Sequence, residues 1–256
     1  MKFKAIVSLL ALAAAGSSFA AINTTQGNAE VFFMAYDKTN QTQDFVFDTG
    51  LSAASLIDGT INGTFNIGAD ANWSSFVSAV GGLSNIGWAV EAVQVAATAN
   101  NKFIYATLGA GASAAASGSN SAFNLAFTPF NTAISNTTVL AGQSEVDAAG
   151  TAPYLANSAA ASKAFDGFAP ASVISFTNAV GTTGVSFFGV ANSNPAKTLN
   201  KVTLFSTPTA LAGFTTNGTL TIGTPVITPS VPEPSSYALA LVALAGIGFV
   251  ARRRAK

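Results

Sequence analysis

Apolar and polar residues alternate with a period of two along much of the chain, which is the spacing of side chains on one face of a β-strand. Residues 29–36 and 42–48 are rich in aromatic and β-branched residues, and the five residues between them have the length of a hairpin loop. Residues 88–96 and 102–108 predict a second hairpin. Further short strands, bounded by Gly, Asn or Pro, are expected at 60–67, 173–177, 185–190, 201–206 and 220–222.

Two stretches of the same region favour helix. One runs from Trp73 to Val80, and the other lies somewhere within the alanine-rich residues 144–164. Residues 109–121 consist of Gly, Ala, Ser and one Asn, a composition typical of a loop. Many short strands with turn residues between them therefore predict a mainly β, antiparallel β-sandwich-like body with one or two short helices.

The first 20 residues have the pattern of a secretory signal peptide. Lys2 and Lys4 precede an apolar segment at residues 5–15, and Ser18-Phe19-Ala20 places small residues at the positions that a signal peptidase reads. This pattern predicts cleavage between Ala20 and Ala21. The body of the protein is then residues 21–230, and it is expected to be exported.

The chain ends in three segments that occur in a fixed order. Val231-Pro232-Glu233-Pro234 is held extended by its two prolines, and an uncharged run follows from Tyr237 to Ala251. As a helix this run measures about 22 Å, which is short for a bilayer, so we expect a marginal transmembrane helix within residues 235–251. Arg252, Arg253 and Arg254 lie in a basic segment, residues 252–256, that predicts a cytoplasmic C-terminus.

These three segments together resemble the PEP-CTERM sorting signal of Gram-negative bacteria, a type of C-terminus also described as an ice-binding protein C-terminal domain. The resemblance rests on Val231 to Pro234, on the span with Gly246-Ile247-Gly248-Phe249, and on Arg252 to Arg254. It implies export, a transient anchor in the lipid bilayer, and cleavage near Pro-Glu-Pro by an exosortase. It also implies association with exopolysaccharide or biofilm matrix. A plain tail anchor is the alternative.

Charge is distributed unevenly between these segments and the body. Six of the 11 basic residues but only one of the 11 acidic residues lie in the two terminal segments, so the body carries a net charge of about −5. Nucleic-acid binding requires a basic surface that displaces counterions from phosphates. We therefore expect no nucleic-acid partner.

The sequence contains neither Cys nor His. Their absence excludes disulfides, thiolate or imidazole metal sites, and nucleophilic triads that use Cys or His. Carboxylates, hydroxyls, amides and a few lysines remain for any chemistry. No cofactor and no metal are expected.

Asp48-Thr49-Gly50, which follows Val46-Phe47, resembles the loop that presents the carboxylate of an aspartic protease. That chemistry needs two carboxylates that share a proton, and the chain contains no second Asp-Thr-Gly or Asp-Ser-Gly. A strand end closed by Asp and Gly is the favoured interpretation. Residues 37–44 place several oxygens in one loop that could hold Ca²⁺, but they lack the ligand spacing of an EF-hand.

Two further groups of residues are candidates for binding or catalysis. Glu145 with Asp147, or Glu91 with a distant partner, could form a glycosidase pair if the fold brought them to the required separation. Trp73, Trp88 and Tyr105 could stack on sugar rings, although aromatic residues at period-two positions more often belong to the core. Threonines on the expected strands are too few for an ice-binding array.

We therefore expect a non-enzymatic surface or extracellular-matrix protein that an exosortase sorts and releases. A carbohydrate-binding module of the matrix is the second hypothesis, and a carboxylate-based hydrolase is the third. The exposure of Trp73, Trp88 and Tyr105 separates the first two, and two carboxylates that converge in a pocket would favour the third.

Overall fold

The computed structural model describes residues 21–95, 102–109, 118–154, 178–192, 199–204 and 210–223. Its strands are β1 Glu30–Asp37, β2 Gln43–Ser52, β3 Asn62–Asn66, β4 Ile86–Val95, β5 Lys102–Thr107, β6 Gly118–Ser119, β7 Ser144–Ala148, β8 Asn178–Ala179, β9 Val185–Asn192, β10 Leu199–Leu204, β11 Leu211–Phe214 and β12 Thr219–Gly223. Its helices are α2 Ala53–Ile57, α3 Ala71–Ala79 and α4 Asn120–Ser135, with short 3-10 turns at Ile67–Ala69 and Leu83–Asn85. The described part of the chain is therefore mainly β, as predicted.

The strands form one antiparallel sheet whose main path runs β3-β12-β11-β9-β5-β4-β1-β2-β7. Strand β10 pairs with β9 and β6, and β8 pairs with β4. The hairpin predicted at residues 29–48 is present, with Met34 of β1 opposite Val46 of β2. The predicted antiparallel pairing is thus confirmed. A sandwich of two separate sheets is not confirmed, because the strands of the described residues are joined into a single twelve-stranded sheet.

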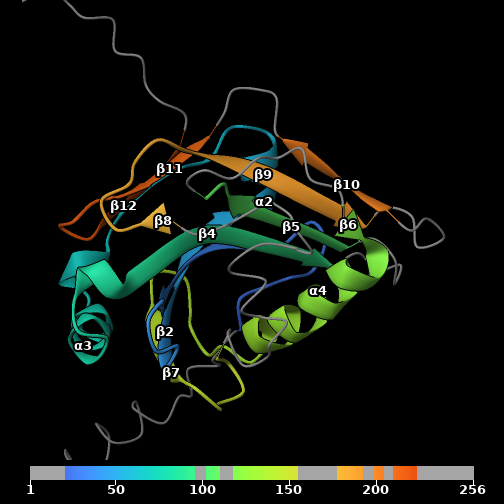
Figure 1. Cartoon of the computed structure of the whole chain (residues 1–256). Helices are drawn as coiled ribbons and strands as arrows, with labels where there is room; N and C mark the ends of the chain where they lie inside the picture. Colours follow the sequence, from blue (N-terminus) through green and yellow to red (C-terminus); the bar gives the residue numbers. More distant parts are fainter. Residues whose placement is uncertain are drawn as a thin grey trace, which may run out of the picture. The chain divides into compact units, whose positions relative to one another are not determined.

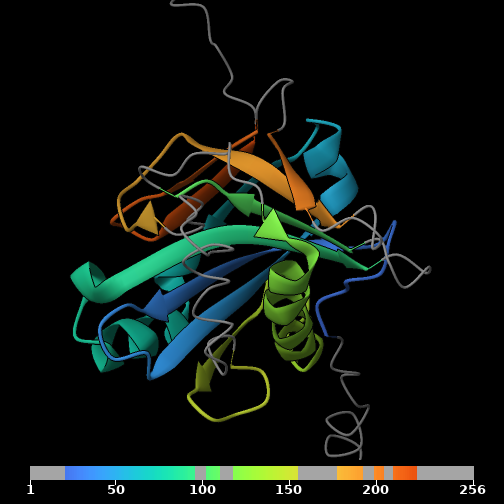
Figure 2. The same cartoon turned by 45° about the vertical axis from the view of Figure 1, so that its right-hand side comes forward.

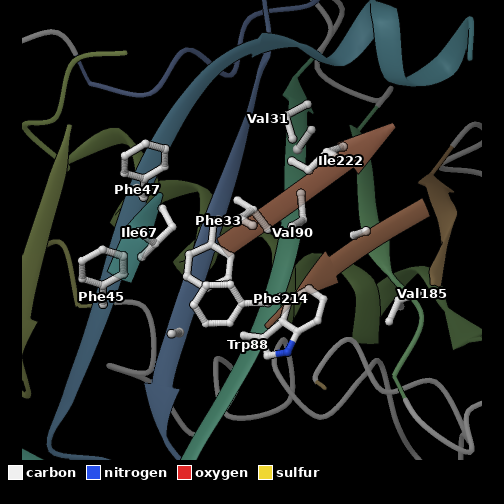
Figure 3. Packing of buried hydrophobic residues seen from close by; sticks show 14 of the residues in the cluster. Val31, Phe33, Phe45, Phe47, Ile67, Trp88, Val90, Val185, Phe214 and Ile222 are labelled. Atoms are coloured by element: carbon white, nitrogen blue, oxygen red, sulfur yellow. The ribbon is translucent and has the colours of Figure 1, made fainter. Parts of the chain in front are cut away.

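This sheet curls until its two ends face each other (Figure 1, Figure 2). Phe33 of β1 and Phe214 of β11 lie against each other with ring centroids 4.7 Å apart, although the three strands β9, β5 and β4 separate them along the sheet. Phe47 of β2 and Phe65 of β3 make a similar contact at 5.5 Å. Figure 3 shows the resulting inner core, in which Phe33, Trp88 and Phe214 are close neighbours. The curl thus buries one face of the sheet against itself.

Helix α4 covers part of the opposite face of the sheet. Phe127, Phe130 and Ile134 recur at helical spacing and enter a second core with Phe32 and Met34 of β1. The rings of Phe32 and Phe130 have centroids 6.2 Å apart. Strand β1 is consequently buried on both faces, and so is most of β4. Both strands therefore contain long apolar stretches where a half-exposed strand would alternate.

Helix α3 is placed much as predicted for residues 73–80. It begins after Asp70, whose carboxylate accepts hydrogen bonds from the backbone N–H groups of Asn72 (2.7 Å) and Trp73 (3.4 Å). The helix buries Trp73 and Phe76 in the inner core. The strand expected at 60–67 is present as β3, whereas the strand expected at 173–177 lies outside the described residues.

The structure differs from the predictions for the middle of the chain. In the stretch 144–164, where a helix was expected somewhere, Ser144–Ala148 is strand β7 and turns follow up to Tyr154, while residues 155–164 lie outside the described residues. Strand β7 forms because it pairs with β2.

Helix α4 was not predicted, and its first residues overlap the stretch 109–121 expected to be a loop. Local composition misled here, because burial of the Phe127–Ile134 face stabilises the helix.

Candidate functional site

Asp48, Thr49 and Gly50 form an irregularity in β2 rather than an exposed catalytic loop. The pairing of β1 with β2 shifts register at this point. Asp48 is 2% exposed, and its Oδ1 accepts a hydrogen bond from the Gly50 N–H at 2.8 Å. Gly50 adopts a φ of 65°, a conformation that favours glycine. The hydroxyl of Thr49 donates to the Val31 carbonyl. The three residues therefore close a bulge between two strands.

The carboxyl group of Asp48 is nevertheless electrostatically unusual. Burial raises its pKa to about 6; repulsion from Glu30 adds to the rise, and the hydrogen bond from Gly50 opposes it.

Asp48 does not pair with Glu91, because the two residues lie on strands that are not neighbours. The register places Asp48 and Glu91 on the two sides of Phe32, in strands β2 and β4. Two strand spacings, roughly 10 Å, separate their backbones, so these two carboxyls do not form a proton-sharing pair.

Asp37 uses both carboxylate oxygens to hold the loop between β1 and β2. Its Oδ1 accepts hydrogen bonds from the N–H groups of Thr39 (2.9 Å) and Asn40 (3.0 Å), and its Oδ2 accepts one from the Thr42 hydroxyl (3.1 Å). Burial opposes ionisation of Asp37, but these hydrogen bonds outweigh it, and the pKa lies below its ordinary value. The Asp37 carboxylate considered for Ca²⁺ thus organises its own loop.

Three acidic side chains meet where β7 joins the edge of the sheet, and we call Asp44, Glu145 and Asp147 the carboxyl cluster. Asp44 of β2 is directly opposite Asp147 of β7, and Glu145 lies two residues before Asp147 on the same face of that strand. Oε2 of Glu145 accepts hydrogen bonds from the Thr138 N–H (3.0 Å) and hydroxyl (2.8 Å). Oε1 of Glu145 and Oδ2 of Asp147 are buried and accept none.

Asp147 is the member of the carboxyl cluster whose pKa is raised most clearly. Burial, followed by repulsion from and hydrogen bonding with Glu145, raises the pKa of Asp147 to about 7. Tyr154 lies nearby and donates its hydroxyl to the Gln41 carbonyl. Burial, and then the charges of Asp44 and Asp37, raise the pKa of Tyr154 to about 12. The cluster is therefore a group of like charges that favours protonation.

The side chains of this cluster interact with the protein itself. Oε2 of Glu145 accepts hydrogen bonds from Thr138, and Asp147 interacts with Glu145 on the same face of β7, whereas the two carboxyl groups of a glycosidase flank a substrate. Within the described residues, no group of three or more acidic side chains is arranged to hold a metal ion. The pairing of Asp44 with Asp147 had no sequence signal, because it depends on the register between strands distant in the chain.

Glu91 is a fully buried acidic residue. It lies in the middle of β4 between Phe32 of β1 and Ala106 of β5, it has no exposed surface, and neither carboxylate oxygen has a hydrogen-bond partner. Burial raises its pKa well above 4.5. Burial without a hydrogen-bond partner thus favours the neutral form of this carboxylic acid.

The structure places the three candidate sugar-binding aromatics in different environments. Trp73 and Trp88 are 5% and 0% exposed, and both pack in the inner core. Trp88 also donates its indole N–H to the Ala179 carbonyl at 2.8 Å. Burial excludes both rings from the sugar-binding role considered for them and places them in the core, the role that their period-two spacing favoured. Tyr105 remains partly exposed and stacks on Phe103, with centroids 6.3 Å apart and planes 5° apart.

The residues predicted for sorting and processing lie outside the described residues, apart from Ala21. They are Ala20, Val231, Pro232, Glu233, Pro234, Arg252, Arg253 and Arg254. The transmembrane helix expected at 235–251 lies outside them as well. Within the part of the chain that the structure describes, no helix has the length and hydropathy needed to cross a bilayer.

Comparison with known proteins gives one finding. Residues 230–254 match the family model described as the PEP-CTERM protein-sorting motif. No curated protein and no solved structure matches the chain. The matched segment contains the Pro-Glu-Pro motif, the apolar run and the arginines, so it confirms the resemblance on which the sorting prediction was based.

Proposed function

We propose that this PEP-CTERM protein serves, after export and exosortase processing, as a non-enzymatic component of the cell surface or extracellular matrix that associates with exopolysaccharide. The motif at residues 230–254 carries the proposal. It identifies an exported protein that is anchored in the membrane for sorting before an exosortase processes it. The step from sorting to the matrix is our inference.

The structural roles of the conspicuous side chains support a non-catalytic function. Asp48 and Asp37 hold backbone N–H groups of their own turns, and Trp73 and Trp88 fill the inner core. Glu145 is held by Thr138, and Asp147 interacts with Glu145 on the same strand. The side chains that suggested catalysis or binding in the sequence thus contribute to the fold.

The test compares the protein from a host that has its exosortase with the protein from the same host after exosortase deletion. We expect the extracellular form of the first host to end near Pro234 and to lack residues 237–256, as determined by mass spectrometry of the intact protein. In the deletion strain the full-length tail should remain in the membrane fraction. An extracellular form that retains Arg252 to Arg254 would instead indicate a simple tail anchor.

A carbohydrate-binding module is the second candidate function, and one observation favours it. Phe103 and Tyr105 are stacked and partly exposed on β5, next to Gly189 of β9, which is opposite Tyr105. Aromatic faces of this kind can stack on sugar rings. Affinity electrophoresis in host exopolysaccharide should show at least a severalfold loss of retardation for Tyr105→Ala. The control Ile57→Ala, which alters an exposed apolar residue elsewhere, should behave like the wild type.

A further inference from the structure

The main path of the sheet ends in two edge strands, β3 and β7, which differ in how they are protected. An edge strand presents backbone N–H and C=O groups with which another strand can pair. Strand β7 carries two carboxyl groups among its five residues, Glu145 and Asp147. Its first residue is also held by α3, because the Asn72 side-chain amide donates to the Ser144 carbonyl at 2.9 Å. Charge and a covering helix thus oppose the addition of a strand to β7.

Strand β3 has neither protection. Its sequence, Asn62-Gly63-Thr64-Phe65-Asn66, contains no charge and no proline. Among the described residues, β3 pairs with β12 alone. The side chains of Asn62, Thr64 and Asn66 are exposed, and Gly63 and Phe65 are partly exposed. The edge of β3 opposite β12 is therefore suited to pairing with a further strand.

The order of residues along β3 suits pairing with a second copy of the same strand. Antiparallel pairing about a two-fold axis at Thr64 places this residue opposite its own copy, and it places Asn62 opposite Asn66 and Gly63 opposite Phe65. Threonine pairs and amide pairs across strands are favourable, and no like charges meet. A small residue also lies opposite a large one.

The same operation applied to β7 gives the opposite result. A two-fold axis at Val146, the central residue of that strand, places Glu145 opposite Asp147 of the second copy. Like charges directly opposite each other destabilise a strand pair. Self-pairing is thus favoured at one edge of the sheet and opposed at the other.

We propose that two copies of this protein associate through β3, which joins the sheet of one copy to the sheet of the other as an antiparallel pair. The interface is isologous, because the same strand contributes from both sides of the two-fold axis. A strand of five residues buries little surface, so the association is weak in dilute solution and depends on a high local concentration. This self-association goes beyond the proposed function and does not depend on it.

The first test uses the full-length chain in membranes of a host that lacks exosortase. The sequence contains no Cys, so a single introduced cysteine reports one contact. Pairing about Thr64 brings the two copies of its Cα atom to about 4.5–5.5 Å, which is within the range of a disulfide. The matched control is Thr221→Cys, because Thr221 is exposed and lies opposite Thr64 on β12. Its two copies would be three strand spacings apart, roughly 14 Å.

We expect mild oxidation to link Thr64→Cys into a dimer at least ~10-fold more efficiently than Thr221→Cys, as measured on non-reducing gels. Equal cross-linking of the two variants would indicate random collision in the membrane and would overturn the proposal. A monomeric Thr64→Cys variant would overturn it as well. Resistance of that cysteine to a maleimide reagent would then show that a segment of the same chain covers β3.

The second test changes the charge at the two-fold axis. Thr64→Glu and Thr64→Lys each place like charges opposite each other in a homodimer, so each should reduce the pull-down between differently tagged copies by at least ~3-fold. Co-expression of the two variants creates a pair of opposite charges and should restore the pull-down. Failure of this mixed pair to associate would contradict pairing at Thr64. Neither test involves exosortase or exopolysaccharide, so a negative result here leaves the proposed function standing.

Discussion

Phe33 is the residue at which most of the inner core meets. Its ring contacts Phe45, Trp88 and Phe214 from three other strands of the curled sheet, and it contacts Trp73 from helix α3. Because these partners are held by their own packing, none of them can move into the space that truncation of Phe33 would leave. The cost of removing it is then the lost burial together with the cavity left behind.

We therefore expect Phe33→Ala to lower the free energy of unfolding by about 3–5 kcal/mol, measured by urea denaturation. Ile57→Ala is the matched control, because Ile57 is an apolar residue that is 42% exposed. It should change the free energy by less than about 0.5 kcal/mol. Similar effects of the two substitutions would mean that the inner core is not packed as described.

Glu91 gives a second prediction at the level of single residues, with a defined pH dependence. The folded protein keeps a proton on Glu91 that the unfolded chain releases above a pKa of about 4.5. Stability is therefore lost as the pH rises from about 4.5 toward the folded-state pKa. Glu91→Leu removes this loss together with the two unpartnered oxygens, so it should stabilise the protein.

The expected gain for Glu91→Leu is about 1–3 kcal/mol at pH 8 and less at pH 5, again from urea denaturation. Asp58→Asn, which replaces an exposed carboxyl group at the end of α2, is the control and should not stabilise the protein. A gain for Glu91→Leu of equal size at both pH values would contradict a raised pKa of Glu91.

Strand β7 is the element whose attachment depends most on charge. On the main path of the sheet it is an edge strand that pairs with β2 alone, and its five residues include two members of the carboxyl cluster. Asp147 is opposite Asp44, and Asp70 at the start of α3 accepts a hydrogen bond from the Ser144 hydroxyl at 2.7 Å. Ionisation of Asp147 places like charges across the β2–β7 pair.

We expect Asp147→Asn to protect the amides of β7 against hydrogen exchange by roughly tenfold at pH 8, after correction for intrinsic exchange rates. The pKa of Asp147 is raised from 3.8 to about 7, so the wild type loses stability as the pH rises between these values. At pH 4 the variant and the wild type should exchange alike. Equal protection at pH 8 would show that the charge of Asp147 does not loosen the strand.

At the scale of the whole molecule, the chain combines a folded body with a sorting segment. The body ends its last described strand at Gly223, and the matched motif occupies residues 230–254. The apolar run 237–251 contains no charge and is short for a bilayer crossing. The transmembrane span that we propose for this run would therefore tolerate no further loss of apolar character.

We predict that the double substitution Leu241→Arg/Leu244→Arg abolishes membrane retention of the unprocessed protein. Each arginine in the middle of a span costs about 2.5–3.5 kcal/mol on the insertion scale. Membrane fractionation in an exosortase-deficient host measures the effect, with Leu241→Ile/Leu244→Ile as the control that keeps the span apolar. Retention of the arginine variant in the membrane fraction would place the anchor elsewhere.

The sequence by itself determined the local and terminal features of this protein. Aromatic and β-branched residues on both sides of a five-residue loop predicted the β1–β2 hairpin, and residues 73–80 were predicted to be helical. The order of Pro-Glu-Pro, apolar run and arginines predicted the sorting motif. These features depend on residues close together in the chain, where side-chain spacing and backbone restriction act directly.

Only the tertiary structure decided which residues meet across long separations. Burial of β1 on both faces, the contact of Phe33 with Phe214, and the pairing of Asp44 with Asp147 all follow from the curl and register of the sheet. The same curl places Trp88 in the core rather than on a sugar-binding face. Helix α4 is stabilised because its apolar residues pack against Phe32 and Met34, on the face of the sheet opposite the inner core. Local patterns fix which side of a strand is apolar, but the partner of that side is set by packing between segments that the sequence leaves far apart.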